Sequence, residues 1–332
     1  MKRILTGIKP TGSPHLGNYL GAIRPALALA QRPDAQALYF IADYHALTTV
    51  HDGDKLDALS REIAATWLAF GLDPEKVVFY RQSAVPEVFE LAWIFACFTS
   101  KGWMNKAHAY KAKVAEAAAA GNPDPDAGIN MGLYEYPVLM AADIVLFDVD
   151  LVPVGKDQIQ HVEIARDIAQ RMNHVYGEGL LKLPEAQVDE NTAIVPGLDG
   201  RKMSKSYDNT IPLFAPPKQL RKIVNKIVTD STPPEAPKDP DTSMIFQLYR
   251  LFATPEQTAA LRDRYQQGIG WGEAKGALAD VLEATLAGPR ERYQALIADR
   301  AGLDAVLARG AERARAMAKP VLDRVRQAVG IR

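Results

Sequence analysis

A glycine- and proline-rich segment follows the first apolar run of the chain and has the composition of a phosphate-binding turn. Residues 6–18 are Thr-Gly-Ile-Lys-Pro-Thr-Gly-Ser-Pro-His-Leu-Gly-Asn, and a helical pattern begins at about Gly17. Nucleotides bind α/β proteins beyond the carboxyl end of a strand, where the amides and dipole of a helix N-terminus favour phosphate. The segment contains neither G-x-G-x-x-G nor a Walker A loop. On position alone, a Gly/Pro turn with a polar cap is an equal alternative.

A second group of polar residues lies in a glycine-flanked segment further along the chain. Residues 200–206 are Gly-Arg-Lys-Met-Ser-Lys-Ser. A mobile basic loop of this kind can close over a polyphosphate and neutralise the charge that develops on it. A solvated basic loop is the ordinary alternative. The string Lys-Met-Ser-Lys-Ser, however, is expected by chance in a chain of this length with odds on the order of 10⁻⁴ from average residue usage.

Strand and helix patterns alternate in the first half of the chain and would position these two groups. Buried strands are predicted at 3–8, 37–42 and 77–81. Helices are predicted from about Gly17, after Asp54 as N-cap, and over 86–98. This order predicts a parallel sheet with helices on both faces, whose strands are near-continuous apolar runs. Pro25 predicts a kink or a restart within the first helix.

Helical patterns replace strand patterns after about residue 213. Helices are predicted over 219–229, 243–253, 255–268, 271–287 and 303–329. A loop with four prolines is predicted over 229–243, and Pro320 should bend the last helix. We therefore expect an α/β, Rossmann-like domain over 1–212, with an inserted helical region at about 99–150 and the basic loop at about 197–209. A helical domain follows over 213–332, with its last helix packing back on the first domain.

Length, charge and cysteine content limit the classes of protein that fit. The chain has 332 residues, which suits two domains. Its net charge is −1, so any contact with nucleic acid needs a local basic surface. The one cysteine, Cys97, excludes an intrachain disulfide and a cysteine-built metal site, and its apolar neighbours predict a buried side chain. We expect a cytoplasmic protein, because no signal-length apolar N-terminus and no run of 18 apolar residues occurs.

The two polar groups together resemble the signatures of class I aminoacyl-tRNA synthetases. His-Leu-Gly-Asn at 15–18 is similar to the family's HIGH signature with asparagine in its last position, and residues 202–206 are similar to its Lys-Met-Ser-Lys-Ser signature. Further segments narrow the resemblance to the tryptophanyl-tRNA synthetases, in order along the chain from about residue 4 to 330. They are Asp43–Ala46, Leu139–Ile144, Val152–Gln158 and His161–Glu163.

The resemblance implies that the protein activates L-tryptophan with ATP and Mg²⁺ to tryptophanyl-adenylate and transfers it to the 3′ end of tRNA(Trp). Positioning and electrostatics would carry this chemistry, with no metal ligand from protein side chains. The implied ATP-binding residues are Gly7, Lys9, His15, Gly17, Asn18, Gly155, Asp157, Lys202, Met203, Ser204 and Lys205. The implied catalytic residues are His15, Asn18, Lys113, Lys202 and Lys205, with Lys111 as a rival to Lys113.

The implied tryptophan site follows a physical logic. Tyr136, Met140 and Asp143 are spaced to share one helix face. Asp143 would accept a hydrogen bond from the indole N–H, which is a donor only, and its apolar neighbours argue against an exposed surface carboxylate. The full set is Leu5, His45, Tyr136, Met140, Asp143, Val152, Val154 and Gln158. A satisfied strand-end histidine is the alternative for His45, and His161 is interpreted as orienting Asp157.

The C-terminal region and the departures from the family pattern complete the expectations. Residues 303–332 hold seven Lys/Arg and three Asp/Glu, a local charge of +4. The resemblance makes this helical domain the anticodon-binding one and the protein a homodimer. The residues expected to bind tRNA are Arg309, Arg313, Arg315 and Lys319, and a solvated basic face is the alternative. Lys9 replaces a glutamine and Leu5 an aromatic residue of many family members, and 101–121 differs from the commoner bacterial form.

Three other functions share some of these features. Tyrosyl-tRNA synthetase has the same fold, but a tyrosine and an aspartate hold its substrate's phenol, and Leu5 leaves no such pair near the first strand. An ATP-dependent adenylate-forming ligase that does not use tRNA would share the His-x-Gly turn and would not need the basic helical domain. A non-catalytic RNA-binding paralogue is disfavoured by the intact Lys-Met-Ser-Lys-Ser string.

Overall fold

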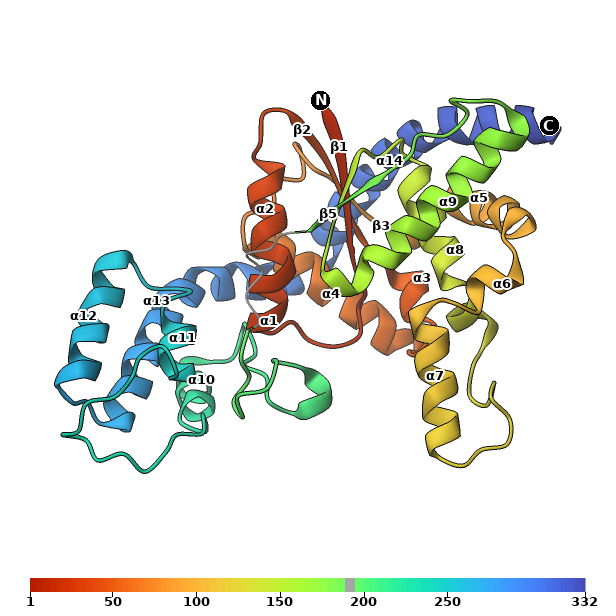
Figure 1. Ribbon diagram of the computed structural model, residues 1–332. Helices are drawn as coiled ribbons and strands as arrows, with labels where there is room; N and C mark the ends of the chain where they lie inside the picture. Colours follow the sequence, from red (N-terminus) through yellow and green to blue (C-terminus); the bar gives the residue numbers. More distant parts are fainter. Residues whose placement is uncertain (189–194, 332) are drawn as a thin grey trace.

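A five-stranded sheet forms the centre of the molecule (Figure 1). The computed structural model describes residues 1–188 and 195–331. The strands are β1 Lys2–Ile8, β2 Ala35–Ile41, β3 Val78–Arg81, β4 Leu151–Val154 and β5 Glu185–Val188. They lie in the order β3-β2-β1-β4-β5, and every neighbouring pair is parallel, which confirms the predicted parallel sheet. Strand β5 has no counterpart among the predicted strands, because it is short, partly exposed and without an apolar run.

The helices of the first half cover both faces of the sheet. They are α1 Leu16–Asn18, α2 Arg24–Ala30, α3 Asp43–Ala46, α4 Gly53–Ala69, α5 Glu87–Phe98, α6 Lys101–Met104, α7 His108–Ala119, α8 Met131–Val145 and α9 Ile159–Tyr176. A wider π-helical turn, Tyr19–Ile23, separates α1 from α2, and Pro25 lies in the first turn of α2 as the predicted restart. The N-cap of α4 is Asp52 and not Asp54, because the Asp52 carboxylate accepts a hydrogen bond from the Lys55 N–H at 3.0 Å.

The second half of the chain is helical. Its helices are α10 Pro217–Val224, α11 Met244–Tyr249, α12 Pro255–Gln267, α13 Trp271–Ala298 and α14 Arg300–Val329. The end predicted for α13 near residue 287 is wrong, and the helix continues through Pro289. Two contacts of the extra turns offset the cost of the proline: buried Arg290 pairs with Glu283 of the same helix at 2.8 Å, and Arg292 donates to the Ala69 carbonyl of α4 at 2.8 Å. The α/β architecture with a helical C-terminal region agrees with the expected fold class.

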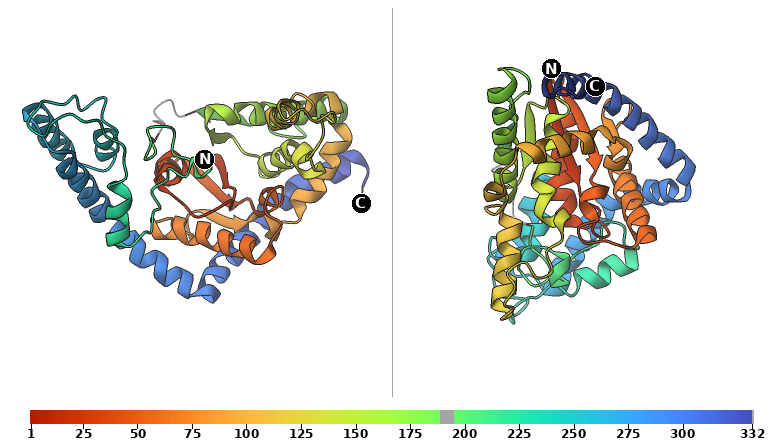
Figure 2. Two further views of the ribbon diagram at one scale, coloured as in Figure 1. Left: turned by 90° about the horizontal axis from the view of Figure 1, so that it is seen from below. Right: turned by 90° about the vertical axis from the view of Figure 1, so that its right-hand side faces the viewer.

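The last two helices tie the C-terminal region to the sheet (Figure 2). Helix α13 leads from α10–α12 towards the sheet, and α14 then runs beside the edge strand β3. Gly310 allows the closest approach, because a Cβ atom there would lie 1.7 Å from the Phe79 carbonyl oxygen. The Arg313 guanidinium donates to the Pro74 carbonyl at 2.7 Å beside the start of β3. The basic last helix is therefore also a packing element of the first domain.

Helix α5 differs from its sequence-based description. Its apolar run predicts a buried Cys97, but Cys97 is exposed. Cys97 follows Phe89 and Trp93 at helical spacing, and the Trp93 side chain is 73% exposed. The run supplies two apolar faces, and only the one that carries Leu91 and Phe95 is buried in the core. The prediction for Cys97 is wrong because an apolar run does not reveal which of its faces the tertiary structure covers.

Candidate active site

A cavity of about 1140 Å³ opens at the carboxyl ends of β1 and β4. The chain proceeds from β1 to β2 and β3 on one side and from β4 to β5 on the other, so these two strands flank the topological switch point. Ligands of open α/β sheets bind at such a point. Gly7 and Phe40 line the cavity together, and a Cβ atom on Gly7 would lie 2.5 Å from the Phe40 ring. The close packing of this ring requires glycine at the end of β1.

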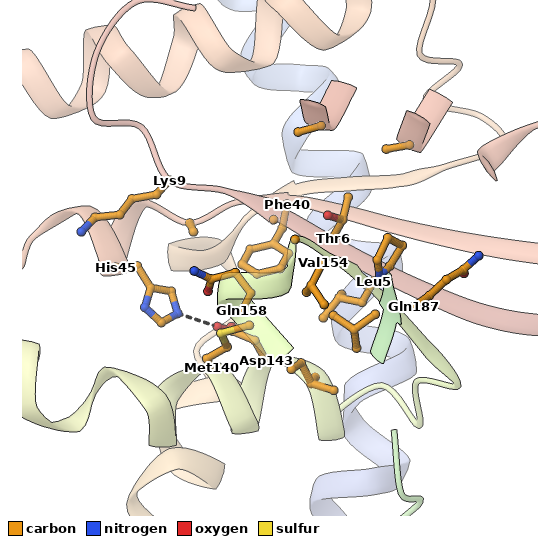
Figure 3. A pocket seen from close by; sticks show the side chains of 18 of the residues that line it. Leu5, Thr6, Lys9, Phe40, His45, Met140, Asp143, Val154, Gln158 and Gln187 are labelled. Carbon is orange, nitrogen blue, oxygen red and sulfur yellow. Dashed lines mark hydrogen bonds and ion pairs between the residues drawn. The ribbon is translucent and has the colours of Figure 1, made fainter. Parts of the chain in front are cut away.

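All eight residues expected to bind tryptophan line this cavity. They come from β1 (Leu5), α3 (His45), α8 (Tyr136, Met140, Asp143), β4 (Val152, Val154) and the short turn after it (Gln158). Figure 3 shows Met140, Asp143 and Gln158 grouped around one hollow, with His45 reaching towards Asp143. The lining also includes Thr6, Thr48, Leu133 and Gln187. Thr6 begins the glycine-rich segment identified in the sequence, whereas Thr48, Leu133 and Gln187 were not predicted, and no motif distinguishes them.

The Asp143 carboxylate lines the cavity, and the residue is only 2% exposed. It accepts hydrogen bonds from His45 Nε2 at 2.9 Å and from the amide nitrogen of Gln82 at 2.8 and 2.9 Å. Burial raises the pKa of Asp143, and the two donors oppose this effect by favouring the charged form. His45 thus lines the cavity and is hydrogen-bonded to Asp143, and both a tryptophan-site role and the alternative of a satisfied histidine are consistent with this position. Gln82 is a polar contact that sequence reasoning missed.

Tyr136 and His161 form a second polar pair beside the cavity. The Tyr136 hydroxyl is hydrogen-bonded to Nε2 of His161, and burial raises the pKa of Tyr136 to about 12, so the phenol is neutral near pH 7. His161 is buried on α9 and is hydrogen-bonded to the tyrosine, and its interpretation as a residue that orients Asp157 stays a prediction. The side chain of Asp157 lies outside the part of the structure that is described.

The glycine-rich turn after β1 presents a neutral histidine at a helix N-terminus. Nδ1 of His15 accepts from the Gly17 N–H at 3.1 Å, and the Asn18 side chain accepts from the His15 N–H at 3.1 Å. Burial, with a smaller effect of the Lys205 charge, lowers the pKa of His15 to about 4. Because Nδ1 is the acceptor of the neutral ring, the proton lies on Nε2. The turn therefore offers an N–H donor suited to a phosphate oxygen.

Tertiary contacts join the basic loop to this turn. The Leu16 N–H donates to the Ile211 carbonyl at 2.9 Å, and the buried Met203 sulfur accepts from the Gly17 N–H at 3.3 Å. Buried Asn209 fastens the loop, since its side chain accepts from the Ser204 N–H at 2.8 Å and donates to the Lys202 carbonyl at 3.2 Å. Sequence reasoning missed Asn209, which follows the signature string in a polar stretch without any pattern.

The lysines expected to bind phosphate are not gathered at the cavity. Among its described lining residues there is one lysine, Lys9, which donates to the Thr48 hydroxyl at 2.8 Å and whose pKa is lowered by burial. Lys205 lies against the turn at Gly12, and burial lowers its pKa as well. Lys202 is exposed, and exposed Lys113 pairs with Glu116 at 2.6 Å on α7. Gly155 lines the cavity.

The basic residues expected to bind tRNA engage groups of the chain itself. Arg313 donates to main-chain carbonyls beside β3, and Arg315 pairs with Glu87 of α5 at 2.9 Å. Lys319 pairs with Asp323 at 2.5 Å, whereas Arg309 approaches Glu75 only at 3.9 Å.

No helix within residues 1–188 and 195–331 is both long enough and apolar enough to span a membrane.

Comparisons with known proteins agree with this geometry. A family model of class I tRNA synthetases for tryptophan and tyrosine matches residues 1–287. The chain is 56% identical over 332 residues to the tryptophan--tRNA ligase of Pseudomonas aeruginosa, with 99% of this chain and 74% of that protein covered. The chain belongs to the tryptophanyl-tRNA synthetase family. Its identity to the tryptophan--tRNA ligase of Neisseria meningitidis serogroup A is 54%, with 100% of this chain and 98% of that protein covered.

A solved structure of the family has the same fold. The tryptophanyl-tRNA synthetase of Campylobacter jejuni, complexed with ADP and tryptophan, superposes with a TM-score of 0.90 at 44% identity. The match covers 99% of this chain and 100% of that chain. Family membership confirms the predicted resemblance, and the nucleotide in that relative supports the use of ATP.

Proposed function

We propose that this protein is a tryptophan--tRNA ligase, which activates L-tryptophan with ATP and then charges tRNA(Trp). The observation that carries the proposal is the buried Asp143 carboxylate in a largely apolar cavity at the switch point of the sheet. A buried acceptor among apolar side chains suits an indole, which combines a large apolar ring with one N–H donor. Relatives of 54% and 56% identity that are tryptophan--tRNA ligases support the same substrate.

The reaction has two steps. A carboxylate oxygen of tryptophan attacks the α-phosphorus of ATP, the bond to the β-phosphate oxygen breaks, and pyrophosphate leaves. A ribose hydroxyl at the 3′ end of tRNA then attacks the carbonyl carbon of the adenylate, loses its proton, and AMP leaves. Because positioning and electrostatic stabilisation dominate phosphoryl chemistry of this kind, the site needs donors aimed at the phosphates and a rigid amino-acid pocket.

Residues of the turn and the basic loop supply the phosphate contacts in this proposal. Neutral His15 donates through Nε2–H, and Lys202 and Lys205 neutralise the charge on the leaving pyrophosphate. The two lysines lie outside the cavity lining, so closure of the loop over ATP precedes the chemical step. Lys9 already faces the cavity from the end of β1 and adds a fourth donor.

Magnesium enters the proposed reaction together with ATP. Mg²⁺ prefers oxygen ligands, keeps several waters and binds enzymes largely through substrate phosphates. Within the described residues, no group of three His, Cys, Asp or Glu could hold a metal ion. We propose that the metal binds through the triphosphate, with His15 and the loop lysines binding the oxygens that the metal leaves free.

The experiment that tests the function is ATP–pyrophosphate exchange. We expect exchange that depends on tryptophan and Mg²⁺ and proceeds without tRNA, because adenylate formation is complete before tRNA takes part. Tyrosine, offered at the same concentrations, is the matched control. Exchange stimulated best by tyrosine, or by no amino acid, would refute the assignment.

Aminoacylation separates the remaining alternative, an adenylate-forming ligase that does not use tRNA. We expect the purified protein to attach labelled tryptophan to total tRNA from a related bacterium. Charging in the same assay with tRNA lacking its 3′-terminal adenosine should be absent, because the accepting ribose is missing. Tryptophan-dependent exchange without any charging would favour the tRNA-independent ligase.

We propose that part of the basic face of α14 contacts tRNA phosphates. Arg309, Arg315 and Lys319 are more than half exposed and suit this role, whereas the contacts of Arg313 with main-chain carbonyls favour packing. Replacement by glutamine of each residue that binds a phosphate should flatten the plot of log K against log salt for tRNA by about 0.9. Pyrophosphate exchange should stay unchanged. An unaltered slope in all four variants would assign the helix to packing alone.

We also propose that the protein is a cytoplasmic homodimer, as translation enzymes of this family are expected to be. The exposed apolar face of α5, with Phe89 and Trp93, is a candidate contact surface, since large exposed apolar patches mark association sites. Sedimentation velocity of the purified chain and of Trp93→Lys tests this. A monomeric native protein, or a dimer that the substitution leaves intact, would remove this face from the proposal.

A further inference from the structure

We infer that Gln82 is a specificity-determining positioning residue, which holds the Asp143 carboxylate in the orientation that accepts the indole N–H. This inference rests on the proposed function. Gln82 lies in the 3-10 turn Gln82–Ala84 that follows β3 and is fully buried. It is absent from the lining of the cavity among the described residues, so it acts on the ligand only through Asp143.

The orientation of the Gln82 amide follows from its partner. Its nitrogen lies 2.9 Å from Oδ1 and 2.8 Å from Oδ2 of Asp143, and an amide oxygen in that place would meet a carboxylate without a proton between them. The other end of the amide, Oε1, is buried and has no hydrogen-bond partner within the described residues. The side chain therefore satisfies the carboxylate at the cost of one orphaned acceptor.

This orphaned acceptor argues against a purely structural role. A buried polar atom without a partner destabilises a fold by the cost of its desolvation, and an apolar side chain of the same shape would avoid that cost. The Asp143 carboxylate is itself an expensive group to bury beside Tyr80 and the apolar core. Both costs are understandable if the pair is kept for ligand recognition.

The turn that carries Gln82 also fixes the other donor to Asp143. The next residue, Ser83, donates from its N–H to the Asp43 carboxylate at 3.0 Å and is hydrogen-bonded to it through its hydroxyl. Asp43 begins α3, the short helix that carries His45. Two consecutive residues after β3 thus contact α3 and α8: Ser83 is bonded to Asp43 of α3, and Gln82 to Asp143 of α8. Asp143 therefore receives one donor from α3, His45, and one from the turn after β3, Gln82.

The remaining acceptor capacity of Asp143 suits the indole. A carboxylate has about four lone-pair positions. The Gln82 amide and His45 Nε2 together make three hydrogen bonds to the Asp143 oxygens, which leaves one position for the indole N–H. The titratable groups that face Asp143 are His45 and Asp43 of α3 and Tyr80 of β3. The hydroxyl of the nearby Tyr136 is instead bonded to His161 of α9. Removing the amide donor leaves His45 as the one hydrogen-bond donor among these described contacts.

Gln82→Met, which keeps the length of the side chain and removes the donor, tests the inference in tryptophan-dependent exchange. We expect kcat/KM for tryptophan to fall about 10- to 150-fold, the usual effect of one hydrogen bond to a charged group. The KM for ATP should stay constant. The advantage of tryptophan over its benzothiophene analogue, which lacks the N–H, should narrow by a similar factor. Gln36→Met, in a glutamine that contacts Arg3 near the start of β2, is the matched control.

The pH profile separates positioning from mere packing. Loss of a donor to the carboxylate raises the pKa of Asp143, so the acid limb of kcat/KM for tryptophan should move to higher pH in Gln82→Met. Gln82→Glu restores a donor while the two carboxyl groups share a proton, so at pH 6 it should be more active than Gln82→Met. This variant also covers the case in which Gln82→Met folds poorly.

Two results would overturn the inference. In the first, Gln82→Met lowers kcat/KM by the same factor for tryptophan and for the benzothiophene analogue, and the pH profile does not shift. In the second, Gln82→Glu is no more active than Gln82→Met at pH 6. A native protein without tryptophan-dependent exchange would instead refute the proposed function. An active native protein whose selectivity survives Gln82→Met would refute only the role of Gln82.

Discussion

Asp143→Ala is expected to abolish most of the preference of this protein for tryptophan over analogues that lack the indole N–H. Sites built around a substrate donor reject analogues without it by about 10⁴–10⁵, because a polar group in a dry pocket loses its partner. Asp143 is such a group, buried at 2% exposure and facing the cavity. The native protein should therefore use 1-methyltryptophan and the benzothiophene analogue poorly. Asp143→Ala should lose activity on tryptophan and narrow its advantage over both analogues.

The measurement is kcat/KM in pyrophosphate exchange for three proteins on three substrates. Asp143→Asn keeps an acceptor oxygen without the charge and should lie between the native protein and Asp143→Ala. If Asp143→Ala lowers activity on all substrates by one common factor, Asp143 holds the helix or the fold. The contact to the indole would then have to be sought at Tyr136, His45 or Gln158.

Lys202→Ala and Lys205→Ala should lower the rate of adenylate formation by about 10²–10³-fold, or about 2.7–4 kcal/mol, by analogy with the loss of one oxyanion donor. Charge on the leaving pyrophosphate grows in the transition state, so a lysine that neutralises it stabilises that state more than the bound substrates. Neither lysine lines the cavity that contains the proposed tryptophan site. Tryptophan affinity should therefore change little in either variant.

Single-turnover adenylate formation and equilibrium binding of labelled tryptophan measure the two quantities separately. Lys218→Ala, in an exposed lysine of α10, is the matched control for loss of a positive charge. A fall in tryptophan affinity in step with the rate constant would contradict the proposed role. Lys113→Ala and Lys111→Ala in the same assays decide which of the two binds phosphate, since Lys113 must first leave Glu116.

Local patterns along the sequence were sufficient for the framework of the protein. Strands β2 and β3 are largely apolar and buried because both faces of a parallel sheet are covered, and such runs are visible without any tertiary information. Strand β1 has the shorter apolar pair Ile4 and Leu5. The glycine-rich turn and the basic loop are continuous strings, and Tyr136, Met140 and Asp143 repeat at helical spacing. Each of these features depends on neighbours within about seven residues, so the sequence by itself determined the α/β class, the family and the eight predicted tryptophan-site residues that line the cavity.

Contacts between distant segments decided the rest. Gln82 meets Asp143 across 61 positions, and His161 meets Tyr136 across 25, so no spacing rule links them. The exposure of Cys97 was predicted wrongly, and the role of the basic residues of α14 was left open, for the same reason. Helical periodicity defines the faces of a helix, but only packing against other elements, such as that of α14 on β3 and α5, decides which face is covered. Hydrogen bonds and burial are properties of pairs in space, and a pair separated by a strand and a crossover helix leaves no periodic trace in the chain.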